Sequence, residues 1–543
     1  MTATAATGEV FTRKASGLVR VMSPTSAFMY NILTMGLVFP WTYLWAPGAL
    51  PGGKLVWGIL LAMVIEIPIG LAYVFLSTAL PRTGGDYVFQ SRVLGGFWGF
   101  VVVISGYTTW FLQWVALSGW LVAYLGFAPL FLGLGATLGN PTLSAIGVWF
   151  THPWPGIVIT SIVNALVGML LLISGFKNYV KVQYWMFYGT LIAFATALIV
   201  LFTTPPSEFV SRLNAFAVAS GGVQNFYQTA RDAVVAAGID LKPPFSLLAT
   251  LLVAPIAWTS LQWAAYSAQQ NGEIKDARSF KNQAFIIIGS LIVTGILLAL
   301  LAVGFERVGG TEFLYVAGAG YWSLIPEANI AGFNMWPNIV AVALTASPLV
   351  VVLIALGYIL NSFQIVNNCY IGATRMLVAM SIDRLLPDWL SKVNDRLHTP
   401  VNAHLIYFLL SIPVILVYNL WGPWYALTLG VTFAGAYVIA TTSFAGALLP
   451  FRAKKVYEAS PGAKYKIGNI PWVTVLGLIG GVLASLMALA FLLAPQLGLV
   501  SKLAYTVVFG IIAFWAIYFF IAKRVQKSRG INVDYAFKEV PPE

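Results

Sequence analysis

Two stretches of this sequence interrupt long apolar runs with residues that can break a helix and bind a small polar solute. The first is the Thr-Met-Gly segment at 34–36, followed by Pro40, and the second spans 254–260 around Pro255. A break in a membrane helix frees backbone N–H and C=O groups, which can bind a carboxylate, an ammonium group or a cation. Two simple proline kinks without a ligand are the alternative. The candidate substrate-binding residues in these stretches are Thr34, Met35, Gly36, Ala257, Trp258, Thr259 and Ser260.

One carboxylate, Glu66, lies deep inside an apolar run, about 15 Å from its outer end at the rise of an α-helix. An ionisable group is costly inside a bilayer and usually faces protein or water. Glu66 is therefore either a proton-coupling site or a structural acceptor for backbone N–H groups of the broken helices. The second interpretation is slightly favoured, because the span that carries Glu66 would support the broken helices.

A further set of polar residues interrupts the apolar run at 338–380. Asn361 and Asn368 are seven residues apart, so they share one face of a helix, and we expect that face to line a cavity. Asn361 is added to the substrate-binding candidates, and Ser362 to the residues with an ion-coupling or structural role. Thr109 and Gln113, four apart, are weaker candidates because single polar residues often only bridge helices.

The composition identifies a membrane protein. Of 543 residues, 59% are hydrophobic and 9% are charged, with a mean hydropathy of +0.84. Soluble domains carry about 25% charged residues, so this chain cannot cover a water-facing surface of ordinary size. The single cysteine, Cys369, excludes a disulfide framework, and the three histidines are scattered. No metal or cofactor is expected, apart from a coupling ion, H⁺ or Na⁺.

Apolar runs long enough to cross a bilayer recur about twelve times. They lie near 26–46, 56–80, 97–126, 154–174, 182–203, 246–268, 283–305, 338–380, 403–420, 425–449, 471–494 and 503–522. With the N-terminus inside, 24 of the 30 Lys and Arg residues fall on the inner side and 6 on the outer side. The sequence therefore predicts a multi-pass protein of the plasma membrane with both termini in the cytoplasm. The basic net charge is assigned to loop orientation and not to nucleic acid.

The run at 338–380 is too long for one upright span. We expect a short helix before Pro348 and a long tilted helix after it.

The loops between spans carry a family resemblance. The segment 80–89, Leu-Pro-Arg-Thr-Gly-Gly-Asp-Tyr-Val-Phe, resembles the Pro-x-x-Gly-Gly-x-Tyr segment of the amino acid–polyamine–organocation (APC) family. The segments 272–278 and 374–387 resemble that family's loops after helices six and eight, and 399–403 resembles the start of helix nine. The resemblance covers spans 1 to 10 and implies an all-α LeuT-type fold, with a 5+5 inverted repeat followed by two C-terminal helices.

This resemblance divides the chain into six parts. They are a cytoplasmic N-terminal segment (1–25), a first repeat (26–203), an extracellular loop (204–245), a second repeat (246–449), a loop with helices 11 and 12 (450–522) and a cytoplasmic tail (523–543).

The resemblance also bears on single residues. It implies that Trp258 is a gate over the substrate. It aligns Thr190 with a lysine that replaces a sodium ion in some relatives, so Thr190 is a candidate for an ion-coupling or structural role. The sequence departs from the family where an acidic residue often follows the sixth-helix glycine, because the stretch 262–264 reads Gln-Trp-Ala.

The predicted function is secondary active transport of a neutral amino acid by alternating access, with the substrate held at broken helices 1 and 6. The predicted partners are that amino acid and the lipid bilayer. A LeuT-type transporter or exchanger of another organic solute, such as a nucleobase or a polyamine, is the alternative. An enzyme is not expected, because the sequence has no Ser/His/Asp arrangement, no HExxH and no phosphate-binding loop. Symport or exchange, and the oligomeric state, stay open.

Overall fold

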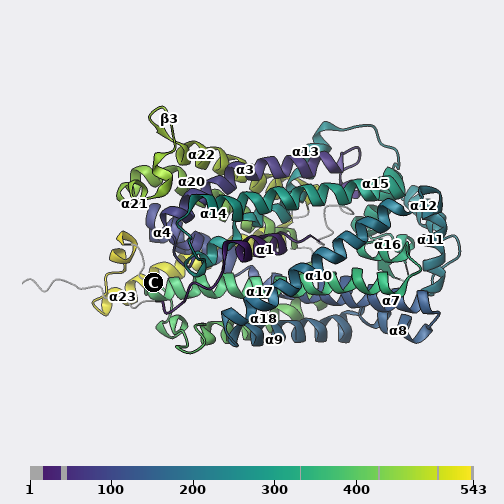
Figure 1. Cartoon of the computed structure of the whole chain (residues 1–543), viewed down its shortest axis with the longest axis horizontal. Coiled ribbons are helices and arrows are strands. Elements are labelled where there is room, and N and C mark those ends of the chain that lie inside the picture. Colours follow the sequence, from purple (N-terminus) through teal and green to yellow (C-terminus); the bar gives the residue numbers. More distant parts are fainter. Residues whose placement is uncertain (1–15, 38–45, 331, 426–427, 498–500, 540–543) are drawn as a thin grey trace, which may run out of the picture.

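The computed structural model describes residues 16–37, 46–330, 332–425, 428–497 and 501–539. Long helices run side by side along the longest axis of the molecule (Figure 1). Eleven of the helical segments in the described residues are long and apolar enough to cross a membrane. The predicted fold class, an all-α multi-pass membrane protein, is confirmed. The first predicted span, 26–46, is only partly described, and Pro40 lies outside the described residues.

The eleven spanning segments follow the predicted order. They are Leu55–Ala79, Gly96–Leu138, Pro153–Ile173, Phe176–Thr203, Leu247–Glu273, Phe280–Trp322, Pro348–Ile382, Val401–Leu420, Thr432–Arg452, Trp472–Leu493 and Lys502–Ser528. Several combine α-helix with 3-10 or π segments. The pairing of these spans into two five-helix repeats stays a prediction.

The helices of the first half are α1 (Pro24–Met35), α3 (Leu55–Ala79), α4 (Gly85–Val93), α5 (Gly96–Val103), α6 (Phe111–Trp120), α7 (Ala128–Leu138), α8 (Pro141–Trp149), α9 (Val158–Ile173), α10 (Phe176–Thr203), α11 (Pro206–Ala219) and α12 (Phe226–Ala236). Those of the second half are α13 (Leu247–Leu261), α14 (Phe280–Ala284), α15 (Ser290–Trp322), α16 (Pro337–Ala343), α17 (Pro348–Ile382), α18 (Val401–Leu420), α19 (Gly422–Tyr425), α20 (Thr428–Arg452), α21 (Lys454–Glu458), α22 (Trp472–Leu493) and α23 (Lys502–Ser528).

The remaining elements are short. The π segments are η1 (Ile104–Thr108), η2 (Leu121–Phe127), η3 (Pro153–Ile157) and η5 (Phe285–Gly289). The 3-10 segments are η4 (Gln262–Glu273), η6 (Pro326–Ala328), η7 (Asp388–Ser391), η8 (Pro461–Lys464), η9 (Pro495–Leu497) and η10 (Val533–Lys538). Two antiparallel strand pairs are described, β1 (Asn329–Ile330) with β2 (Phe333–Asn334) and β3 (Lys466–Ile467) with β4 (Ile470–Pro471).

The region around Pro348 forms as the sequence predicts. A seven-residue helix, α16, ends at Ala343, and the 35-residue α17 begins at Pro348. A proline at the first helical position costs no hydrogen bond, because that N–H has no partner within the helix. Pro348 therefore starts α17 and does not kink it.

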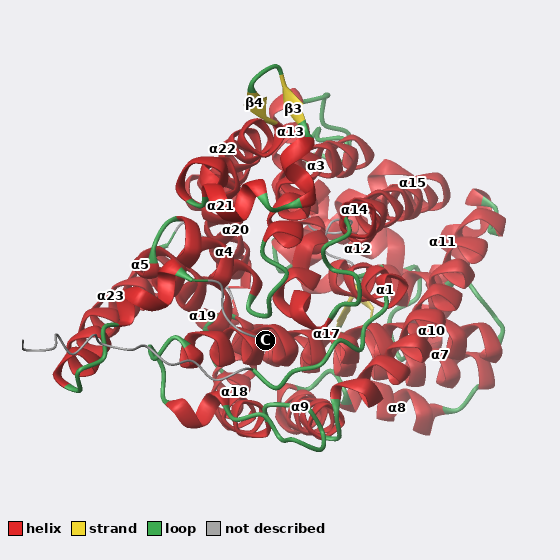
Figure 2. Ribbon diagram, turned by 60° about the vertical axis from the view of Figure 1, so that its left-hand side comes forward, coloured by secondary structure: helices red, strands yellow, loops and turns green. Residues whose placement is uncertain are grey.

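Close helix packing depends on small residues, as in other membrane bundles. A Cβ at Gly477 of α22 would lie 2.5 Å from the carbonyl oxygen of Ser443 in α20, and a Cβ at Gly357 of α17 would collide with Ala193 of α10. The short helix α1 lies inside the bundle and packs against α10, α15 and α17 (Figure 2). This position brings the end of α1 to the middle of the protein.

Buried ion pairs tie the helices together at one end of the bundle. Arg375 of α17 binds Glu273 of η4 through two hydrogen bonds of 2.8 and 2.9 Å, and both side chains are buried. Arg92 of α4 binds Asp383 after α17 at 2.6 and 3.0 Å. Both described ends of the chain lie here, since Gly17 contacts the loop after α17 and Glu539 accepts a hydrogen bond from Arg92.

Asp86 of α4 is a third buried group at this end. Its carboxylate accepts hydrogen bonds from Tyr73 of α3 and Thr442 of α20, each at 2.5 Å, and from Gln269 of η4. Burial raises the pKa of the Asp86 carboxyl above its ordinary value, and these hydrogen bonds pull it back in part. One side chain thus joins four elements at this end of the bundle.

The buried pair of Arg375 and Glu273 predicts a large loss of stability on mutation. Glu273→Gln leaves the Arg375 charge buried without its carboxylate, which costs about 3–5 kcal/mol. We expect a clear fall in the melting temperature of the detergent-purified protein. The matched control is Glu208→Gln, because Glu208 pairs with Arg212 at 2.6 Å while both side chains are 41–49% exposed. That change should cost at most about 1 kcal/mol, and equal melting temperatures for the two variants would contradict the prediction.

Candidate functional site

A cavity of about 30 Å³ lies where α1 ends. Five elements line it: α1, α6, α13, η4 and α17. The lining residues are Thr34, Met35, Phe111, Trp114, Thr259, Ser260, Trp263, Tyr266, Ile365, Asn368 and Cys369. One water needs about 10–15 Å³ by this measure, so the cavity holds about two waters. An amino acid can enter only when some of these side chains move.

The end of α1 provides one wall. The helix stops after Met35, and Gly36 adopts φ 82°, a conformation that glycine tolerates and other residues rarely adopt. One freed carbonyl group and one side-chain hydroxyl at this end find partners on α17. Nδ2 of Asn361 donates to the carbonyl oxygen of Leu33 at 3.0 Å, and Nδ2 of Asn368 donates to the hydroxyl of Thr34 at 2.5 Å.

The two asparagines differ in their relation to the cavity. Asn368 lines it, whereas Asn361 is buried against the α1 backbone and is not among its lining residues. Ser362, the next residue along α17, is also buried and outside the lining.

The second break lies later than the sequence predicts. The stretch 254–260 stays α-helical, including Pro255, and the change to 3-10 geometry comes at Gln262. A membrane helix tolerates proline when neighbouring groups satisfy the backbone that it frees. Within α13, Thr259 and Ser260 line the cavity, and the Ser260 hydroxyl has no hydrogen-bond partner among the described residues. Ala257 is buried beside them and is not a lining residue.

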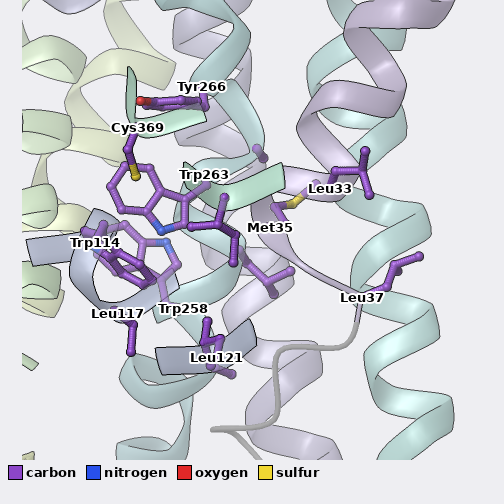
Figure 3. Close-up of a cluster of buried hydrophobic side chains, with 14 of the residues drawn as sticks. Leu33, Met35, Leu37, Trp114, Leu117, Leu121, Trp258, Trp263, Tyr266 and Cys369 are labelled. Atoms are coloured by element: carbon purple, nitrogen blue, oxygen red, sulfur yellow. The ribbon is translucent and has the colours of Figure 1, made fainter. Parts of the chain in front are cut away.

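Trp258 and Glu66 form one buried unit. The indole Nε1 of Trp258 donates to Oε2 of Glu66 at 2.6 Å, and both residues are 0% exposed. The other carboxylate oxygen of Glu66 has no hydrogen-bond partner among the described residues. The partner of Glu66 is thus a side chain on α13 and not a backbone N–H. Trp258 itself lies next to the cavity but outside its lining (Figure 3).

The remaining candidates lie away from the cavity. Thr190 of α10 is buried, and its hydroxyl has no hydrogen-bond partner among the described residues. Thr109 donates to the carbonyl oxygen of Ile104 and accepts from Trp515, and Gln113 is buried outside the lining.

The aromatic wall is the part of the site that sequence reasoning missed. Phe111 and Trp114 of α6 pack directly against Trp263 and Tyr266 of η4, and Figure 3 shows Trp114 and Trp263 close together. Spacings of three residues place each pair on one helix face, which was a usable signal. Because 14% of the chain is aromatic, such pairs of rings are frequent and this one does not stand out in the sequence. In the sequence, Trp263 stands out only as a departure from the family pattern.

The comparison with known proteins identifies the class. Residues 25–514 match the family of amino acid permeases, and the chain therefore belongs to that family, as the APC resemblance predicts. Its apolar helices agree with a multi-pass membrane protein of that family.

Two of the relatives are described as transporters. Uncharacterized transporters of Mycobacterium bovis and Mycobacterium tuberculosis are 26% identical to the chain over 368 residues, which is 66% of this chain and 66% of each relative. An uncharacterized protein of Sulfolobus islandicus rod-shaped virus 1 is 33% identical over 78 residues, 14% of this chain and 20% of that protein. The matched region thus covers two thirds or less of each relative.

The position of Trp258 predicts a loss of transport on mutation. Trp258→Ala removes the indole beside the cavity and the donor to Glu66. We expect uptake into proteoliposomes to fall at least about tenfold, because small displacements of the groups that position a substrate lower rates strongly. The protein should still insert and keep its size-exclusion profile. Trp57→Ala on the same bundle is the control, because Trp57 is 67% exposed on α3. Wild-type kinetics for Trp258→Ala would show that this residue has no part in transport.

Proposed function

We propose that this permease is a secondary active transporter of neutral amino acids. The substrate binds at the cavity between the end of α1 and the start of η4, and an ion gradient drives its uptake by alternating access. The observation that carries the proposal is the lining of the cavity, where the described residues supply hydroxyl, amide, thiol and aromatic groups and no charged side chain. A charged substrate side chain would have no ionic partner there, and an unpaired buried charge is costly.

The polar wall suits the two charged groups that every amino acid carries. The C-terminal end of α1 has a partial negative charge from its free carbonyl groups, which favours the ammonium group. The Ser260 hydroxyl, without a partner among the described residues, can donate to the carboxylate. The aromatic wall then faces the substrate side chain.

Glu66 acts in this proposal as a positioning residue. It accepts the indole hydrogen bond and so fixes the orientation of Trp258 beside the cavity. The coupling ion is H⁺ or Na⁺, and the two are separated by imposing each gradient in turn. The bias of Lys and Arg to one side supports an orientation with both termini in the cytoplasm.

An uptake panel tests the substrate class. Purified protein in proteoliposomes is offered labelled glycine, alanine, serine, leucine, phenylalanine, glutamate, lysine, arginine, a nucleobase and a polyamine, with a proton or a sodium gradient. We expect the highest kcat/KM for a neutral amino acid. A charged amino acid, the nucleobase or the polyamine as the best substrate would refute the proposal.

The role of Glu66 predicts different results for two substitutions. Gln keeps an acceptor oxygen for Trp258, so Glu66→Gln should preserve both substrate counterflow and gradient-driven uptake. Its new amide N–H groups lower stability by about 1–3 kcal/mol if one stays unpaired. Glu66→Ala removes the acceptor and should impair both activities.

A proton carrier would behave differently. Normal counterflow together with a loss of pH-driven uptake in Glu66→Gln would show that Glu66 carries a proton, and it would contradict the positioning role.

A further inference from the structure

The indole of Trp263 occupies the centre of the aromatic wall. It is 6% exposed and its ring lies 5.6 Å from Tyr107, 5.8 Å from Phe111, 6.0 Å from Trp114 and 5.5 Å from Tyr266, measured between ring centroids. These are the separations of favourable tilted and edge-to-face aromatic pairs. Four neighbours therefore hold this one ring in place.

Local geometry aims the ring at the cavity. Trp263 is the second residue of η4, directly after α13 changes to 3-10 geometry. Side chains three residues apart eclipse in a 3-10 helix, so Trp263 and Tyr266 lie on the same side. Tyr266 is anchored by a hydrogen bond of 2.9 Å from its hydroxyl to the carbonyl oxygen of Asn368.

The opposite side of the Trp263 indole packs near α20. A Cβ at Gly435 of α20 would lie 3.7 Å from Cη2 of Trp263, an ordinary van der Waals contact, so the backbone of α20 lies close to this edge of the ring. The indole thus fills the space between η4 and α20, and about 30 Å³ stays open beside it. The space for each added atom of a substrate side chain must come from that volume or from movement of a packed ring.

We propose that Trp263 limits the size of the transported side chain and restricts this permease to amino acids with small side chains, such as glycine, alanine and serine. The inference rests on the proposed function, since it names the substrate class of the same site. A branched or aromatic substrate would have to displace an indole that four rings hold. A small side chain adds the least to the movement that the entry of any amino acid requires.

The test compares selectivity ratios in proteoliposomes. For each variant, kcat/KM is measured for alanine, leucine and phenylalanine, and the leucine/alanine and phenylalanine/alanine ratios are calculated. Trp263→Ala should raise both ratios about tenfold or more, the range that single-group pocket changes produce. The matched control is Trp110→Ala, because Trp110 is also buried, lies near the start of α6 and does not line the cavity. Its ratios should equal those of the wild type.

Two further measurements keep the outcome unambiguous. Trp263→Leu keeps an apolar side chain of moderate size, so it should fold if the alanine variant does not, and it should raise the ratios to a smaller extent. Folded Trp263 variants with wild-type ratios, or a wild-type protein that prefers leucine or phenylalanine to alanine, would overturn the size limit while leaving amino acid transport intact. A wild-type protein that takes up no amino acid would instead refute the proposed function, and the size limit with it.

Discussion

Inside a bilayer, every backbone N–H and C=O group must find its hydrogen-bond partner within the protein. The end of α1 must meet this constraint, because the helix stops at Met35 inside the bundle. The amide of Asn361 meets it for Leu33, whose carbonyl oxygen accepts its hydrogen bond, while Asn368 binds the side-chain hydroxyl of Thr34. These two hydrogen bonds join α17 to the end of α1 at the polar wall of the cavity.

The cavity therefore has two walls of opposite character. The end of α1, the hydroxyls of α13 and Asn368 form a polar wall, and the rings of α6 and η4 form an aromatic one. An amino acid has the same division, with two charged groups at one end and a side chain at the other. This match between site and solute supports amino acid transport more directly than any single residue does.

The ion pairs at the two ends of the bundle differ in burial. At the end near both described termini, the pairs Arg375–Glu273 and Arg92–Asp383 are buried. At the end that carries α11 and α12, the described pair Arg231–Glu312 is partly exposed, with side chains 36% and 27% accessible (Figure 1). Breaking a buried pair costs several times more than breaking an exposed one. The described buried ion pairs thus lie at the end near both described termini.

The sequence by itself determined the all-α membrane fold, the order of the described spans and the family. These properties depend on local hydrophobicity and on loop motifs, which a linear pattern contains. It also singled out Thr34, Met35, Thr259 and Ser260, which line one cavity in the structure, while their role in substrate binding stays a prediction.

Only the tertiary structure decided which side chains meet. The hydrogen bond between Glu66 and Trp258 joins residues 192 positions apart, and the aromatic wall brings Phe111 to Trp263. The change to 3-10 geometry at Gln262, later than expected, likewise depends on neighbours that satisfy the backbone around Pro255. Such contacts depend on how helices rotate and approach one another, and packing sets that rotation in a chain where nearly every helix face is apolar.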